Sequence, residues 1–110
     1  MSFKVASVEE YFNTLDKRFQ VKGAKGVTAV FQFELGAEGT WHVDVKNEGM
    51  TVVKGAHTAP TTTIKMSGPD FIKMSNGELN GQLAYMSGKM KIAGSIPMAM
   101  KMKEIFPQVG

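Results

Sequence analysis

The residues of this 110-residue chain that could carry acid–base chemistry are His42, Asp44 and His57. His42 and Asp44 stand two positions apart, so in a β-strand both side chains would project from one face, where a carboxylate can orient an imidazole as a general base. They alternate with apolar neighbours such as Trp41 and Val43. We therefore expect the pair to face water, and we expect His57 to lie in a loop with no ligand cluster nearby. A small enzyme built on His42 and Asp44 is kept as a minor alternative.

Other reactive constellations are missing from the sequence. There is no cysteine, which excludes disulfides, thiolate catalysis and cysteine-type zinc sites. No G-x-S-x-G elbow, phosphate-binding loop or dinucleotide glycine pattern occurs, and the acidic residues are scattered singly. The last lysines alternate with methionine and isoleucine instead of aromatic residues, which argues against nucleic-acid binding. We therefore predict no catalytic residue, no cofactor, no metal ion and no nucleic-acid partner.

The segment GKMKIAGSIPMAMKMKEIF, residues 88–106, combines flexible apolar side chains with positive charge. It holds four of the nine methionines and four lysines, Lys89, Lys91, Lys101 and Lys103. Residues 1–81 contain nine basic and nine acidic side chains, so the four lysines and one glutamate that remain carry the whole net charge of +3. A lysine near an anionic membrane surface contributes about 1 kcal/mol of attraction. The four lysines are therefore predicted membrane contacts, with ordinary solvated lysines as the alternative.

The elements that must position these residues begin with a helix and four strands. Ser7 and Glu10 form a capping-box pattern, and apolar residues then recur at helical spacing as far as Phe19. Residues 23–26 read as a turn. The period then changes to two, which predicts strands at residues 27–35, 41–46, 50–54 and 61–66. A glycine-bearing connection favours a hairpin for the first two strands, and we expect all four to form a meander.

The second half of the chain returns to helices. Ser67 followed by a proline and an aspartate predicts a helix start, and Asn80 can cap a further short helix. Met90 and Ile92 alternate with lysines as a fifth strand, and Ser95 can cap a last helix that runs toward a proline at position 107. The order predicts one α+β domain over residues 1–110, with a five-stranded, mainly antiparallel sheet covered on one face by about four to five helices.

The last helix carries more apolar surface than packing on one sheet face requires. Met98, Met102 and Ile105 share one stripe, while Ile96, Met100 and Lys103 form the neighbouring stripe. Methionine often fills irregular gaps in a core, and this is one interpretation of the surplus. The other is that one stripe packs and the second lines a ligand cavity.

Three segments give the chain a family likeness: GTWHVDVKNE, TTIKMSGPDFIKMSNGELN and GQLAYMSGKMKIAGSIPMAMKM. In these segments, and in the order of elements over nearly its whole length, the chain resembles the sterol carrier protein 2 family of nonspecific lipid-transfer domains. The resemblance implies an apolar tunnel between sheet and helices for a fatty acid, acyl-CoA, sterol or phospholipid. By position, it implies these wall residues: Phe33, Trp41, Phe71, Met74, Leu83, Met86, Ile96 and Met100.

The resemblance also bears on partners and location. We expect a monomer that binds lipid and contacts anionic membranes transiently, in the cytoplasm. Relatives of this kind also occur in peroxisomes, but the ending Gln108-Val109-Gly110 is no peroxisomal signal. The chief alternative is a noncatalytic accessory or scaffold module with the same fold, whose cavity would be filled by Met100, Tyr85 and other side chains.

Overall fold

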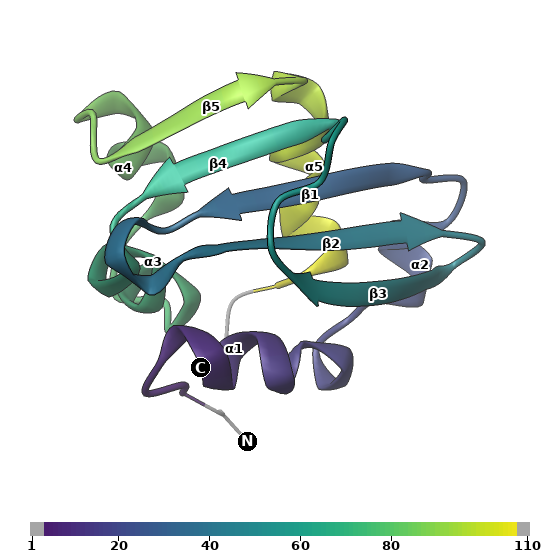
Figure 1. The fold of residues 1–110 in the computed structure, drawn as a ribbon, viewed down its shortest axis with the longest axis horizontal. Coiled ribbons are helices and arrows are strands. Elements are labelled where there is room, and N and C mark those ends of the chain that lie inside the picture. Colours follow the sequence, from purple (N-terminus) through teal and green to yellow (C-terminus); the bar gives the residue numbers. More distant parts are fainter. Residues whose placement is uncertain (1–3, 108–110) are drawn as a thin grey trace.

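The centre of the molecule is a five-stranded sheet with the spatial order β3-β2-β1-β4-β5 (Figure 1). The computed structural model describes residues 4–107, so the C-terminal tripeptide lies outside the described residues. The strands are β1 (Ala29–Glu34), β2 (Thr40–Lys46), β3 (Gly49–Lys54), β4 (Thr62–Met66) and β5 (Met90–Gly94). Three of the four strand pairs are antiparallel, and β1 pairs with β4 in parallel. The predicted α+β class and mainly antiparallel sheet are confirmed.

The predicted four-stranded meander is wrong. The first three strands follow one another as neighbours, but β4 pairs with β1 instead of β3. The connection after β3 crosses in front of the sheet and brings Thr61 beside Val30 (Figure 1). The Thr61 amide donates to the Val30 carbonyl, and the Thr61 hydroxyl accepts from the Val30 amide, each at 2.9 Å. These two bonds fix the start of β4 on β1, so the chain crosses the sheet instead of turning back on β3.

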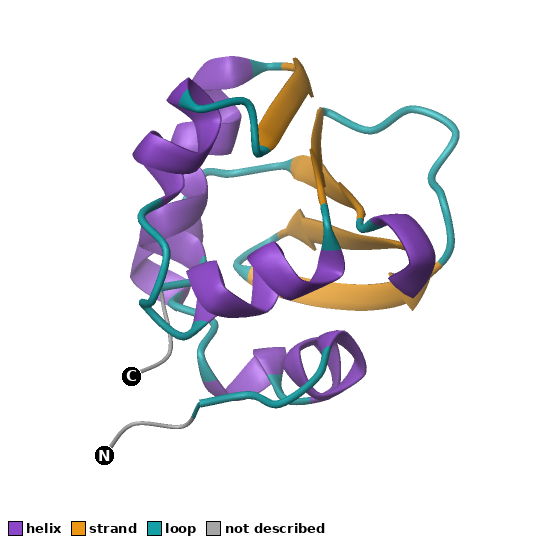
Figure 2. Cartoon of the chain, turned by 90° about the vertical axis from the view of Figure 1, so that its left-hand side faces the viewer, coloured by secondary structure: helices purple, strands orange, loops and turns teal. Residues whose placement is uncertain are grey.

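The helices are α1 (Val8–Asn13), α2 (Val21–Ala24), α3 (Gly68–Ser75), α4 (Gly81–Met86) and α5 (Ile96–Ile105). The predicted caps are present: Ser7, Ser67, Asn80 and Ser95 each accept a hydrogen bond from the backbone amide three residues ahead, at 3.1–3.2 Å. The larger helices lie on one side of the sheet, as the view at right angles shows (Figure 2). No helix within residues 4–107 is long and apolar enough to cross a membrane.

The first helix is shorter than its apolar periodicity indicates. It ends at Asn13, and a separate 3-10 turn, Leu15–Lys17, continues the same buried side. The Glu10 carbonyl accepts both the Thr14 amide at 3.1 Å and the Thr14 hydroxyl at 2.8 Å, and threonine and asparagine are weak helix formers. The helix α2 replaces part of the turn expected at residues 23–26.

Candidate functional site

One apolar row crosses the inner face of the sheet and connects a filled region with a hollow one. Trp41, Phe33, Ile64 and Ile92 are aligned as direct neighbours on β2, β1, β4 and β5. At the β2 end, α1 covers the row, and the Phe12 ring stacks on Trp41 with ring centroids 4.7 Å apart. Toward the β5 end, Phe33, Ile64 and Ile92 line a cavity beneath α4 and α5. The same row of side chains therefore packs in the hydrophobic core under α1 and forms the floor of a cavity under α5.

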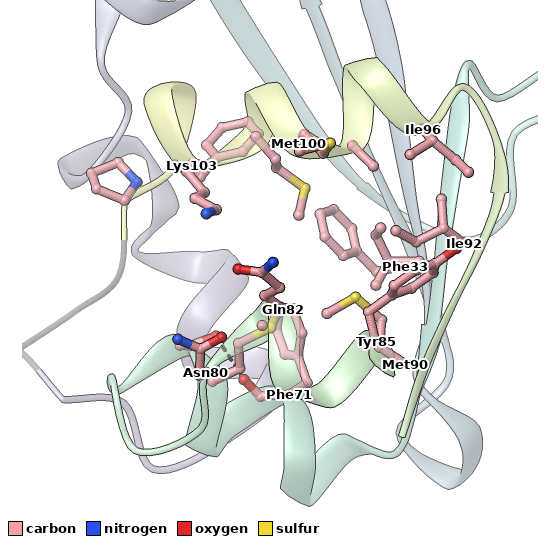
Figure 3. A pocket seen from close by; sticks show the side chains of 18 of the residues that line it. Phe33, Phe71, Asn80, Gln82, Tyr85, Met90, Ile92, Ile96, Met100 and Lys103 are labelled. Atoms are coloured by element: carbon pink, nitrogen blue, oxygen red, sulfur yellow. Dashed lines mark hydrogen bonds between the residues drawn. The ribbon is translucent and has the colours of Figure 1, made fainter. Parts of the chain in front are cut away.

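This cavity has a volume of about 680 Å³ and is open to the surface. Its floor comes from β1, β4 and β5, one wall from α3 and α4, and the opposite wall from α5 and the residues after it (Figure 3). Its size falls in the range of about 300–1,000 Å³ that is usual for small-molecule sites. The lining is mostly apolar and includes Phe33, Ile64, Phe71, Met74, Met86, Met90, Ile92, Ile96, Ala99, Met100, Met102 and Phe106.

The structure brings six of the eight expected wall residues to this cavity. They come from β1, α3, α4 and α5: Phe33, Phe71, Met74, Met86, Ile96 and Met100. The α5 stripe of Ile96, Met100 and Lys103 faces the hollow, whereas Ile105 from the other stripe is fully buried. Met102 belongs to that other stripe but also lines the cavity.

Trp41 and Leu83 lie elsewhere. Trp41 is 6% exposed and packs under α1, with the Lys54 ammonium 5.3 Å from the centre of its ring. Leu83 is 62% exposed on the outer side of α4 and is not part of the lining. Neither residue type nor position in the sequence distinguishes Trp41 and Leu83 from the residues that line the cavity. Whether a side chain lines the cavity depends on how the helices pack on the sheet.

An exposed apolar rim surrounds the opening of the cavity. It consists of Tyr85 and Met86 on α4 with Ile96 and Met100 on α5, which line the cavity and are each more than 40% exposed, and Leu83 is exposed on the same helix α4. The other large apolar side chains of residues 4–107 with comparable exposure are Val21 on α2 and Val53 on β3, which are not part of the lining. The apolar surface exposed by the described part of the chain is thus concentrated around the cavity.

The four lysines of the C-terminal segment have different surroundings. Lys89 and Lys91 are exposed at the edge strand β5 and beside it. Lys101 lies 3.9 Å from the Glu104 carboxylate, one turn further along α5. Lys103 lines the cavity together with the polar residues Ser75, Asn80 and Gln82. Sequence reasoning grouped Lys103 with the other three because side-chain direction is not visible in a run of alternating lysines.

The deepest polar ring near the cavity belongs to Tyr11. Its ring is held edge-on against Phe71 at 4.8 Å, and the Arg18 guanidinium lies 4.6 Å from the ring centre on the side of α1. Burial raises the pKa of Tyr11 from 10.0 to about 12, although the positive charge and hydrogen bonding of Arg18 lower it. Tyr11 is therefore a neutral phenol at physiological pH. It contributes a largely apolar surface to the wall.

Several lining residues were not foreseen as such. These residues belong to the apolar patterns of predicted helices and strands: Tyr11, Met90, Ile92, Met102 and Phe106. Periodicity distinguishes the buried face of an element from its exposed face, but it does not show whether the buried face packs in the core or borders a cavity. Gln82 had no signal at all. Its role as a wall residue follows only from the placement of α4 across from α5.

The histidines occupy the opposite face of the sheet. His42 is 8% exposed because the connection after β3 covers it, so the expectation that it faces water is wrong. Its Nδ1 lies 2.8 Å from the Gly55 carbonyl oxygen, and its ring meets the His57 ring edge-on at 5.1 Å. His42 is thus engaged by the connection, with no hydrogen bond to Asp44 among the described residues. Within residues 4–107, no cluster of histidine, aspartate and glutamate is suited to hold a metal ion.

Comparison with known proteins finds relatives over almost the whole chain. The profile of the SCP-2 sterol transfer family matches residues 12–107. Hydroxysteroid dehydrogenase-like protein 2 from Mus musculus is 36% identical over 106 residues, which cover 94% of this chain and 22% of the mouse protein. Sterol carrier protein 2 from Gallus gallus is 35% identical over 107 residues, with 90% and 20% covered. The chain therefore spans only about a fifth of the length of these curated relatives.

A solved structure of similar size shares the fold. Palmitated SCP2L2 from Aedes aegypti matches with a TM-score of 0.70 and 28% identity, over 90% of this chain and 93% of that one. The fold described above therefore recurs in a protein whose structure was solved in a palmitated form.

Proposed function

This chain belongs to the SCP-2 sterol transfer family, and on that premise we propose that it carries a lipid in the cavity between sheet and helices and exchanges it with membranes. The observation that carries the proposal is the open, mostly apolar cavity of about 680 Å³ with an exposed apolar rim. The cavity would be the tunnel that the resemblance implies. The carrier acts without catalytic residues, as a monomer in the cytoplasm.

The energetics favour exchange over irreversible extraction. Burying a methylene group gains about 0.8 kcal/mol, so an acyl chain of about fifteen methylenes gains roughly 12 kcal/mol relative to water before ordering costs. A bilayer offers the same chain nearly the same gain. The free-energy difference between carrier and membrane is therefore small, and the protein should both load and unload at a membrane surface.

The rim residues and lysines supply the contact with that surface. Met86 stands on α4 at the opening, Leu83 is exposed on the same helix, and Lys89 and Lys91 are exposed beside and on the neighbouring strand β5. Apolar side chains can enter the boundary between head groups and acyl chains while lysines remain among anionic head groups. A carrier that docks in this way presents its opening directly to the lipid it is to take up.

A filled cavity was the main alternative, with Met100 and Tyr85 as the filling side chains. Met100 is 66% exposed and Tyr85 is 45% exposed, and both stand on the wall of the open space. Their position supports lipid carriage over an accessory module with a filled interior.

The direct test is saturable binding of a fluorescent fatty acid to delipidated protein. We expect binding at micromolar protein, and we expect Ala99→Trp to weaken it at least about tenfold because Ala99 lines the cavity and an indole would occupy the space. Ala93→Trp is the matched control, since Ala93 is exposed on β5 and is not part of the lining. Circular dichroism verifies that both variants fold. Absence of saturable uptake by the unmodified chain would refute lipid carriage.

A further inference from the structure

We infer that Lys103 makes the cavity selective for lipids with an anionic head, and that the head is held between Lys103 of α5 and Gln82 of α4. This inference rests on the proposed lipid carriage and adds to it the charge of the head group and the residue that selects it. The alternative, a cavity indifferent to head-group charge, would fit neutral sterols and alcohols equally well.

The first observation is the charge of the lining. Among the described residues that line the cavity, Lys103 is the one with a charged side chain, and none of them is an aspartate or glutamate. Nothing within the lining therefore neutralises the ammonium group. An anion that enters meets attraction from Lys103 and no carboxylate to repel it.

The second observation is that Lys103 has no partner within residues 4–107. No ion pair or hydrogen bond joins its Nζ to another group of that range. Lys101, two positions earlier on the same helix, is paired with Glu104 at 3.9 Å and does not line the cavity. The two lysines thus share a helix and a charge but differ in what each faces.

The third observation is the distribution of polar groups. Lys103, Gln82 and Asn80 lie on one side of the cavity, while Phe33, Ile92 and Ile96 lie on the other (Figure 3). The Asn80 Oδ1 already accepts the Leu83 amide at 3.1 Å as the cap of α4, so its NH₂ group is the part free to donate. The cavity therefore has one end rich in donors and another end that is apolar except for the Tyr85 hydroxyl (Figure 3), an arrangement that suits a single amphiphile.

The chemistry of the polar end favours a carboxylate or a similar oxyanion. An ammonium and an amide NH₂ are both donors, and hydrogen bonds that involve charged partners are stronger than neutral ones. An alcohol head can accept one such bond but gains no Coulomb attraction. Because Lys103 is exposed to solvent, the preference is modest, and we expect about threefold to tenfold in affinity.

The test compares two ligands with the same tail, decanoate and 1-decanol, by calorimetric titration of the delipidated chain. We expect decanoate to bind more tightly than 1-decanol, by about threefold to tenfold. Lys103→Met should abolish that difference by weakening decanoate alone, and Lys103→Arg should restore it. Lys101→Met is the matched control and should leave both affinities unchanged, because Lys101 faces away from the lining.

The outcomes separate this inference from the proposed function. If both ligands bind and Lys103→Met leaves their ratio unchanged, head-group selection by Lys103 is refuted and lipid carriage stands. If Lys101→Met changes the ratio as much as Lys103→Met, the effect comes from overall charge and the inference is also refuted. If neither ligand binds the unmodified chain, both proposals fail. Added salt should reduce the decanoate preference of the unmodified chain and leave the ratio of the two affinities unchanged in Lys103→Met; a salt-independent preference in the unmodified chain would contradict the inference.

Discussion

Tyr11 links the packing of α1 to the cavity wall through a single ring. Its edge contacts Phe71 of α3, and its face carries the Arg18 guanidinium. The Arg18 side chain is held in place by the Thr14 hydroxyl at 2.9 Å and by the Tyr11 carbonyl at 2.8 Å. A phenol in such a place remains neutral well above its ordinary pKa, which makes the residue a pH-dependent element of stability.

We expect the free energy of unfolding to fall between about pH 10 and pH 12 because of Tyr11. The pKa of Tyr11 is raised to about 12 in the folded chain and is near 10 in the unfolded chain, so its stabilisation is complete below pH 10 and is lost as pH rises through 12. A shift of two units corresponds to about 2–3 kcal/mol. Urea denaturation across this range should show a smaller loss for Tyr11→Phe than for the unmodified chain.

The matched control for that measurement is Tyr85→Phe, since Tyr85 is the second tyrosine of the chain and is 45% exposed. It should follow the pH profile of the unmodified chain, because the buried Tyr11 is present in both. Equal profiles for Tyr11→Phe and Tyr85→Phe would contradict the role given to burial of Tyr11.

Many of the residues that line the cavity could be predicted from the sequence, but the boundary between the cavity and the filled core could not. Phe71, Met74 and Met100 were nominated by family resemblance and line the hollow. Trp41 was nominated in the same way and is covered by α1. The sequence does not show whether an aromatic or methionine side chain packs in the core or lines a cavity, because in both places the side chain lies on the apolar face of its helix or strand.

At the scale of elements, the close approach of α2 to α5 determines where the cavity wall stands. The Gln20 amide donates to the Ile105 carbonyl at 2.9 Å, and Gly23 of α2 lies against the backbone of Glu104. A Cβ at position 23 would overlap the Glu104 carbonyl oxygen. The short helix α2 can therefore support α5 only because position 23 has no side chain.

We expect Gly23→Ala to lower the free energy of unfolding by about 1–3 kcal/mol, since neither backbone can move away without breaking the contact between α2 and α5. Thermal denaturation measures the change. Gly49→Ala serves as the control and should remain within about 0.5 kcal/mol, because a Cβ there would meet the Lys46 carbonyl at an ordinary 3.6 Å. A neutral Gly23→Ala would show that α5 is not held at this distance.

Element prediction succeeded where the signal is local and failed where it depends on distant chain. Ser67, Asn80 and Ser95 cap the helices that they were expected to cap, because a cap needs only the next three residues. The pairing of β4 with β1 depends on Thr61 and Val30, which are 31 residues apart. The formation of α2 likewise depends on its contact with α5. The glycine within this short helix led to its prediction as a turn.

At the scale of the whole molecule, the apolar rim stands at the opening of the cavity, and Lys89 and Lys91 are exposed at the neighbouring edge of the sheet, on and beside β5. In the proposed function, docking and release of the ligand would therefore take place at the same side of the molecule. Docking by electrostatic attraction depends on the ionic strength of the medium, because exposed charges are screened over about 8 Å at physiological salt.

We expect vesicle-to-vesicle transfer of a fluorescent fatty acid to accelerate with anionic lipid and to slow with salt. Lys89→Glu with Lys91→Glu should reduce the rate on anionic vesicles by about fivefold or more, at about 1 kcal/mol per lysine. Lys22→Glu with Lys25→Glu makes the same change of charge around α2, away from the rim, and should have a smaller effect. Equal effects of the two pairs would contradict docking through the rim.

The origin of the cavity lining along the chain has a consequence for how ligand preference can change. Only Tyr11 and Phe33 come from the first half of the chain, and all the other lining residues lie between Ile64 and Pro107. One uninterrupted stretch of sequence thus encodes nearly everything that a guest would touch. Exchanging that stretch between relatives would transfer ligand preference as a unit, while the first helix and the hairpin of β1 and β2 would remain unchanged.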